Sequence, residues 1–113
     1  MFIENLEVIK MYKVKQFLHA NQFILYDNDS LYLQSYNTIV ASIKRDRQFI
    51  DGTLHDVKKI TLGKHWNYSK TTSVHVYAFL EKYANIEYNT TNKRLETQKL
   101  IDSGIILYNA DME

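Results

Sequence analysis

A run of hydroxyl side chains, Ser69, Thr71, Thr72 and Ser73, comes just before His75 in the stretch HWNYSKTTSVHVYAFL. A hydroxyl beside an imidazole is the pairing that nucleophilic catalysis uses, because the imidazole can remove the hydroxyl proton. Serine nucleophiles usually also need a sharp glycine-flanked turn, and no glycine adjoins this run. These hydroxyls are instead typical helix N-caps, because they accept a hydrogen bond from a free backbone N–H. We therefore predict the start of a helix and no catalytic residues.

The histidines are the next candidates for chemistry. The closest spacing among His19, His55, His65 and His75 is ten residues, whereas zinc ligands usually pair within three to five. The chain has no cysteine, which excludes thiolate ligands, thiol nucleophiles and disulfides. We predict no metal site, and interpret His75 as a partly buried histidine that donates to a backbone carbonyl.

Motifs for phosphate or dinucleotide cofactors are missing, because neither G-x-x-x-x-G-K-[ST] nor G-x-G-x-x-G occurs. The nearest pair of carboxylates, Asp27 and Asp29, lies in a turn sequence, where short acidic side chains stabilise the bend. We predict no cofactor and a protein that is not an enzyme. The alternative, an enzyme, would lose its activity in a folded His75→Ala variant.

Charge is distributed unevenly along the chain, although the total is only +1. Residues 44–80 hold seven basic and three acidic side chains, while the segments on either side are net acidic. Cations beside flat aromatic rings suit an anionic partner, either a phosphate backbone or an acidic protein surface. The other interpretation is a solvated hairpin whose lysines protect a sheet edge. The predicted partner-binding residues are Lys44, Arg45, Arg47, Lys58, Lys59, Lys64, Trp66 and Tyr68.

The hydrophobic pattern predicts an α+β fold: a small antiparallel β-meander packed by two or three helices. Helices are expected at about 11–21, from Ser69 to about Ala84, and at about 92–103, where Thr90, Thr91 or Asn92 can be the N-cap and Gly104 fits the C′ position. Strands are expected at 22–27, 30–36, 37–45 and 56–63, with turns at 27–29 and 51–52, and an edge strand at 105–109. Within the turn after Tyr36, Asn37 is expected to take the positive φ, with Thr38 opening the next strand.

Length and composition place the chain among single globular domains. It has 113 residues, of which 45% are hydrophobic and 24% charged, and no linker rich in Gly, Ser or Pro divides it. We therefore expect one domain over residues 1–113. Its longest apolar run, VYAFL, is too short to span a membrane, and acidic residues interrupt its amino terminus. We expect a soluble, cytoplasmic protein that does not act at a membrane.

The chain contains two linked motifs that resemble those of a known family: SYNTIVA at 35–41 and WNYSKTTSVHVYAFL at 66–80. Residues 35–80 resemble a family of small, uncharacterised phage- and plasmid-borne proteins of low-GC Gram-positive bacteria. The resemblance implies mobile-element biology, and it marks a ligand site at Tyr36, Asn37, Thr38, Ser69, Thr71, Thr72 and His75.

Small proteins of that kind look like inhibitors of host defences, anti-CRISPR proteins among them. The resemblance therefore implies a non-enzymatic binding protein that inhibits a bacterial defence protein, an RNA-guided nuclease, by direct contact. The alternative is a small nucleic-acid-binding module or regulator that uses the basic 44–70 segment. The sequence does not indicate an oligomeric state.

Overall fold

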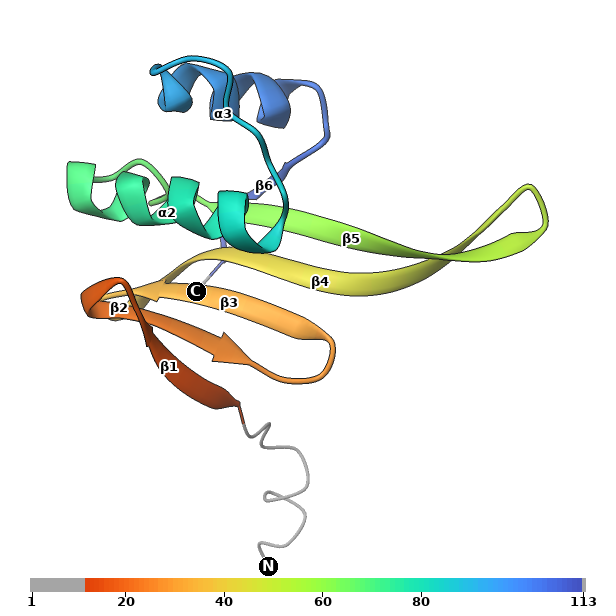
Figure 1. Cartoon of the computed structure of the whole chain (residues 1–113), viewed down its shortest axis with the longest axis horizontal. Coiled ribbons are helices and arrows are strands. Elements are labelled where there is room, and N and C mark those ends of the chain that lie inside the picture. The colour runs from red at the N-terminus through yellow and green to blue at the C-terminus, as the bar shows by residue number, and fades with distance from the viewer. Residues whose placement is uncertain (1–11, 113) are drawn as a thin grey trace, which may run out of the picture.

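Six strands and two helices make up the described part of this computed structural model, residues 12–112 (Figure 1). The elements are β1 (Lys13–Phe17), β2 (His19–Tyr26), β3 (Ser30–Ser35), β4 (Thr38–Ile50), β5 (Thr53–Gly63), α2 (Lys70–Tyr83), α3 (Lys93–Asp102) and β6 (Leu107–Asn109). The strands form one sheet in chain order, β1 to β6. Neighbours are antiparallel from β1 to β5, and β6 runs parallel to β5. The predicted α+β class is confirmed, and the sheet is mixed because of β6.

One row of apolar residues crosses the middle of the sheet and forms the base of the core. Ile24 on β2 lies opposite Leu33, Leu33 opposite Ala41, and Ala41 opposite Leu62. All four side chains are fully buried. Because alternate residues of a strand face the same side, this row fixes which face of each strand belongs to the core.

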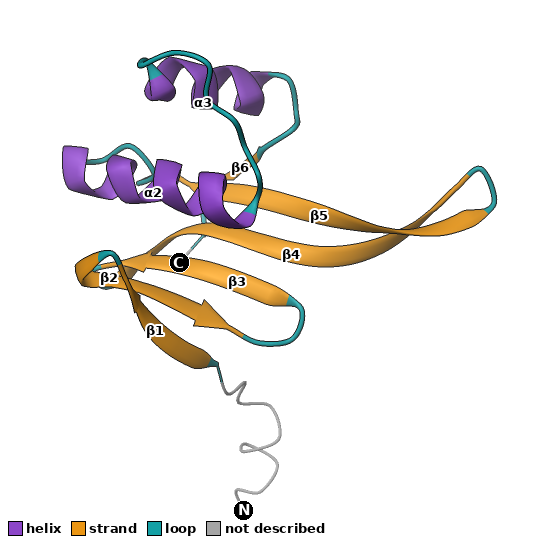
Figure 2. Ribbon diagram, viewed as in Figure 1, coloured by secondary structure: helices purple, strands orange, loops and turns teal. Residues whose placement is uncertain are grey.

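Helix α2 covers that face (Figure 2). Val76, Phe79 and Leu80 recur at helical spacing and are fully buried against the sheet residues. The helix begins where the hydroxyl run predicts, because the Ser69 side chain accepts a hydrogen bond from the Thr72 N–H. The predicted start and end of this helix are confirmed.

The hairpin of β4 and β5 extends well beyond the part of the sheet that α2 covers (Figure 1). Its turn is the predicted Asp51–Gly52 pair, with φ values of 53° and 79°. Two consecutive positive φ angles are typical of a type I′ turn, whose twist matches that of the strands it joins. From Lys44 to Asp56 every side chain is exposed, so the outer half of the hairpin contributes no residue to the hydrophobic core.

The helix predicted at about 11–21 is wrong in its described part, residues 12–21, where β1 and the start of β2 lie instead. Leu18 adopts a φ of 67°, which ends one strand and turns the chain directly into the next. Phe17 is buried, whereas Val14 and Leu18 are 59% and 69% exposed. The apolar residues at helical spacing therefore do not share a buried face.

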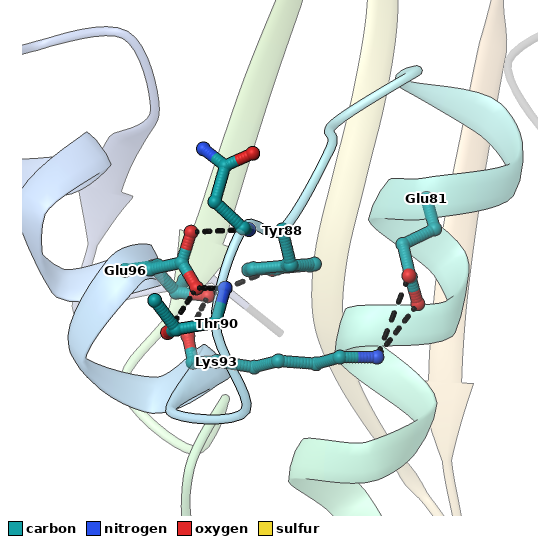
Figure 3. Close-up of polar contacts among 7 residues, drawn as sticks. Glu81, Tyr88, Thr90, Lys93 and Glu96 are labelled. Carbon is teal, nitrogen blue, oxygen red and sulfur yellow. Dashed lines mark hydrogen bonds and ion pairs between the residues drawn. The ribbon is translucent and has the colours of Figure 1, made fainter.

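Polar contacts tie helix α3 to α2 and to the loop between the two helices (Figure 3). Lys93 forms an ion pair of 3.3 Å with Glu81 on α2, and the Tyr88 hydroxyl lies 2.8 Å from that of Thr97. Of the three candidate caps, Asn92 is the one that caps α3, since its side chain accepts from the Leu95 N–H. Gly104, at φ 83°, follows the C-cap in the predicted position.

The Glu96 carboxylate holds this loop together. It accepts hydrogen bonds from the Thr90 hydroxyl at 2.6 Å and from the backbone N–H groups of Thr90 and Asn89, both at 2.9 Å. These bonds, above all that from the Thr90 side chain, hold the pKa of Glu96 below its usual range. A depressed carboxyl pKa stabilises the fold above the unfolded pKa, and this stabilisation is lost as pH falls through the folded pKa.

We therefore expect Glu96→Gln to lower the melting temperature at neutral pH, and to reduce the further loss of stability on acidification. The measurement is thermal unfolding from neutral pH to below the ordinary glutamate pKa of about 4.3. Glu87→Gln is the matched control, since Glu87 is exposed and makes no hydrogen bond or ion pair within residues 12–112. Identical acid dependence in the two variants would rule out this role of Glu96.

Candidate functional site

The exposed part of the hairpin, residues 44–59, is called the β4–β5 ribbon below. It carries five of the eight predicted partner-binding residues, all exposed: Lys44, Arg45, Arg47, Lys58 and Lys59. Cross-strand register places Lys44 opposite Lys59 and Arg45 opposite Lys58. The structure thus brings together cations that are up to fifteen residues apart in the chain. It concentrates them at the base of the ribbon.

The side chains of these cations are held to different degrees. Arg47 pairs with Asp56 at 3.3 Å and Lys59 lies 4.0 Å from Asp46, both as exposed pairs. Lys58 donates to the Tyr83 carbonyl at the end of α2. Arg45 has no ion-pair partner within residues 12–112. Because exposed pairs contribute only about 0–1 kcal/mol, the cations remain available to an external anion.

The tip of the ribbon is apolar, a feature that was not predicted from the sequence. Phe49 lies opposite Leu54, next to Ile50 at the turn. Their exposed fractions are 76%, 48% and 45%. The signal was present as apolar residues on both sides of the Asp51–Gly52 turn, where a solvated hairpin would carry polar ones.

A cavity of about 400 Å³ opens at the base of the ribbon. Arg45 and Lys58 line it together with Lys82 near the end of α2, and Asp27 and Asp29 of the β2–β3 turn line it as well. Arg45 donates its backbone N–H to the Asp29 carbonyl at 2.8 Å, which fixes the ribbon to that turn. Three cations and two carboxylates therefore share one hollow.

Lys64, Trp66 and Tyr68 lie at or beyond the opposite end of β5 from the ribbon tip, so they do not join the ribbon surface. Trp66 is only 3% exposed and belongs to the hydrophobic core, where its ring packs edge-on to that of Tyr77 at 6.5 Å. The prediction that Trp66 contacts a partner is wrong, because burial removes it from the surface. Lys64 is exposed, and Tyr68 is 78% exposed.

The two sequence motifs meet at a second cavity of about 360 Å³, called the motif cavity below. Tyr36 and Thr38 reach it from the β3–β4 turn, and Thr72 from the first turn of α2. The positive φ expected at Asn37 falls on Tyr36, at 56°. The remaining lining residues are Ser35, Val40, His65 and Tyr68.

The other motif residues lie around the cavity and do not line it. Ser69 caps α2, Asn37 and Thr71 are exposed, and His75 is 7% exposed. The His75 Nδ1 atom lies 2.7 Å from the Thr71 carbonyl, which confirms the predicted backbone contact. Its ring centre lies 5.9 Å from that of His19. Within residues 12–112, no three histidine or carboxylate side chains are close enough to hold a metal ion.

Neither described helix has the length and apolar composition that crossing a membrane would require.

Comparison with known protein families finds a match. The model of a family of unknown function, DUF8033, matches residues 5–102, which is most of the chain. No curated protein and no solved structure matches the chain.

Proposed function

We propose that this chain, which belongs to the DUF8033 family of unknown function, is a non-enzymatic binding protein that contacts a protein partner through the β4–β5 ribbon. The observation that carries the proposal is the ribbon tip, where Phe49 is 76% exposed beside Ile50 and Leu54. Exposed apolar residues that gather in one place mark interaction sites more often than isolated ones do. The ribbon also projects from the sheet, so a partner can reach both of its faces (Figure 1).

The chemistry of the ribbon defines the partner surface. An apolar tip requires an apolar depression, and the cations at the base, Arg45, Lys58 and Lys82, require acidic groups beside it. Aromatic and arginine side chains supply most of the binding energy at protein interfaces. Phe49, Arg45 and Arg47 are therefore the proposed anchors, and Trp66 is not among them.

The proposed target is a bacterial defence protein, an RNA-guided nuclease. This part of the proposal is supported by the motif resemblance to phage- and plasmid-borne proteins alone. Inhibition would follow from occlusion, because a ribbon bound at a functional surface of the nuclease prevents its substrate from approaching.

The tip is tested by a double variant, Phe49→Ser with Leu54→Ser. We expect this variant to capture none of the proteins that the wild-type chain captures from host lysate, because the two apolar side chains that lie opposite each other at the tip are gone. Leu95→Ser is the matched control: Leu95 is 49% exposed, similar to Leu54, but lies on α3. Proteins retained by both variants and the wild type alike would refute binding through the tip.

Nucleic acid is the second candidate partner, because a two-stranded β-ribbon can enter the major groove of DNA. The cross-strand cation pairs at the base of the ribbon favour it. A salt titration of duplex binding tests this candidate. Phosphate contacts predict a log–log slope of about −0.9 for each phosphate neutralised, and no binding at low salt would eliminate the candidate.

A further inference from the structure

Two buried residues, Ser35 and Thr72, form the floor of the motif cavity and belong to a chain of hydrogen-bonded side chains. Gln22 Nε2 donates to the Ser35 hydroxyl at 2.9 Å, and Ser35 and Thr72 share a hydrogen bond of 3.0 Å between their hydroxyls. The Ser69 hydroxyl in turn donates to Thr72 Oγ1 at 3.2 Å. Gln22, Ser35 and Thr72 are at most 5% exposed. This chain connects β2, β3 and α2 beneath the cavity.

The hydrogens in this chain do not all find acceptors. Ser69 gives its hydroxyl hydrogen to Thr72, and one hydrogen fills the bond between Ser35 and Thr72. If Ser35 donates there, the Thr72 hydrogen is left; if Thr72 donates, the Ser35 hydrogen is left. With the Gln22 amide donating to Ser35, one O–H has no acceptor within residues 12–112 in either case, and both residues that can carry it line the cavity. The buried Gln22 Oε1 atom also has no hydrogen-bond partner there.

A buried donor without an acceptor costs free energy unless something supplies the missing bond. The cavity is open, so its occupant can supply it. The floor therefore selects an occupant that carries a hydrogen-bond acceptor.

The mouth of the cavity selects a flat ring. Tyr36 and Tyr68 line it with exposed fractions of 53% and 78%, and the His65 ring lies edge-on to Tyr68 at 5.5 Å between centres. Aromatic side chains of this kind pack against planar rings by stacking or edge contacts. Val40 supplies an apolar wall.

Among the residues that the structure describes, no lysine, arginine, aspartate or glutamate lines the motif cavity. An ionised ligand would leave its charge unpaired on entering, which is costly. The volume of about 360 Å³ is at the small end of ligand sites, which span roughly 300–1,000 Å³.

From these features we infer that the motif cavity binds an uncharged, planar ring compound that bears a carbonyl oxygen and is about the size of a nucleobase. The ring lies among Tyr36, His65 and Tyr68, and its carbonyl accepts the spare O–H of Ser35 or Thr72. The site is separate from the β4–β5 ribbon, so it does not depend on the proposed function.

The test compares two uncharged planar probes by two-dimensional NMR of the full chain: uracil, which carries carbonyl oxygens, and indole, which carries none. We expect uracil to shift the amide signals of Tyr36, Tyr68 and Thr72 saturably. Indole is expected to bind about tenfold more weakly, the size of effect that one hydrogen bond has.

Three variants separate the roles of floor and mouth. Thr72→Val is expected to abolish the preference for uracil over indole, whereas Thr72→Ser keeps it. A purely structural role of Thr72 would change both affinities alike and leave their ratio intact. Tyr68→Ala is expected to weaken both probes at least tenfold, with little effect on folding, because Tyr68 is 78% exposed.

Three results would overturn the inference: no saturable shift with uracil, equal affinity for the two probes, or full affinity in Tyr68→Ala. An Arg45→Glu, Arg47→Glu variant is expected to bind uracil normally. Failure of the ribbon proposal and failure of the cavity proposal are therefore distinguishable.

Discussion

Exchanging Arg45 and Arg47 for glutamate is expected to reduce partner binding at least thirtyfold, while the free energy of unfolding changes by no more than about 1 kcal/mol. Both side chains are exposed, and register together with the alternation of a strand places them on one face of the ribbon with Phe49. An arginine that anchors an interface contributes about 2 kcal/mol or more, which corresponds to about a thirtyfold change in the dissociation constant. The stability change is small because both the lost Arg47–Asp56 pair and the new repulsion between position 47 and Asp56 involve exposed groups.

The control for this variant carries the same change in net charge elsewhere on the surface. Arg94 and Lys99 are exposed on α3, away from the ribbon, and Arg94→Glu with Lys99→Glu reverses two positive charges in the same way. Binding by titration calorimetry and melting by circular dichroism are measured for both. Equal loss of affinity in the two variants would show that only overall charge matters.

Trp66→Ala is expected to lower the free energy of unfolding by roughly 3–5 kcal/mol, the usual cost of removing a large aromatic side chain from a core. Trp66 is 3% exposed and packs within the cluster that includes Val76, Phe79 and Leu80. Since domains of this kind are stable by only about 5–15 kcal/mol, this loss is a large part of the total. Urea unfolding monitored by circular dichroism measures it.

Tyr68→Ala serves as the comparison, since Tyr68 is two residues away and 78% exposed. Its effect on unfolding is expected to stay within about 0.5 kcal/mol, as for most surface substitutions. A Trp66→Ala variant that unfolds like the wild type but loses a partner would restore the surface role that the sequence suggested for Trp66.

The elements most accurately predicted from sequence are those with local chemical signals. Ser69 and Asn92 cap the two described helices, Gly104 follows the second, and Asp51–Gly52 forms the turn of the long hairpin. Each signal depends on backbone groups within a few residues, so the sequence is sufficient to read it.

The errors arise where contacts between distant parts of the chain determine the secondary structure or the burial of a residue. Val14 and Leu18 are at helical spacing with Phe17, yet pairing with β2 makes β1 a strand, and both stay exposed. Trp66 resembles an interface aromatic in its basic segment, but its burial depends on α2, which follows in the chain. In β4, a register shift accompanies the burial of both Val40 and Ala41, which regular alternation of a strand would place on opposite faces.

The candidate sites were predicted only in part, because the sequence shows composition and motifs but not the contacts between distant elements. Charge counting identified the ribbon cations, and the motif resemblance identified Tyr36, Thr38 and Thr72, because composition and motif are properties of the sequence. The hollow shared with Lys82 and the hydrogen bonds beneath the motif cavity are not, since both join residues of α2 to strand residues more than twenty positions earlier in the chain.

Photo-cross-linking tests most directly whether the β4–β5 ribbon is the surface that contacts the partner. A benzophenone amino acid is placed at Phe49 in one chain and at Leu95 in another, both exposed positions, and each is irradiated with the captured partner. If the partner binds through the ribbon, we expect a cross-linked adduct from position 49 and none from position 95. An adduct from position 95 alone would contradict it.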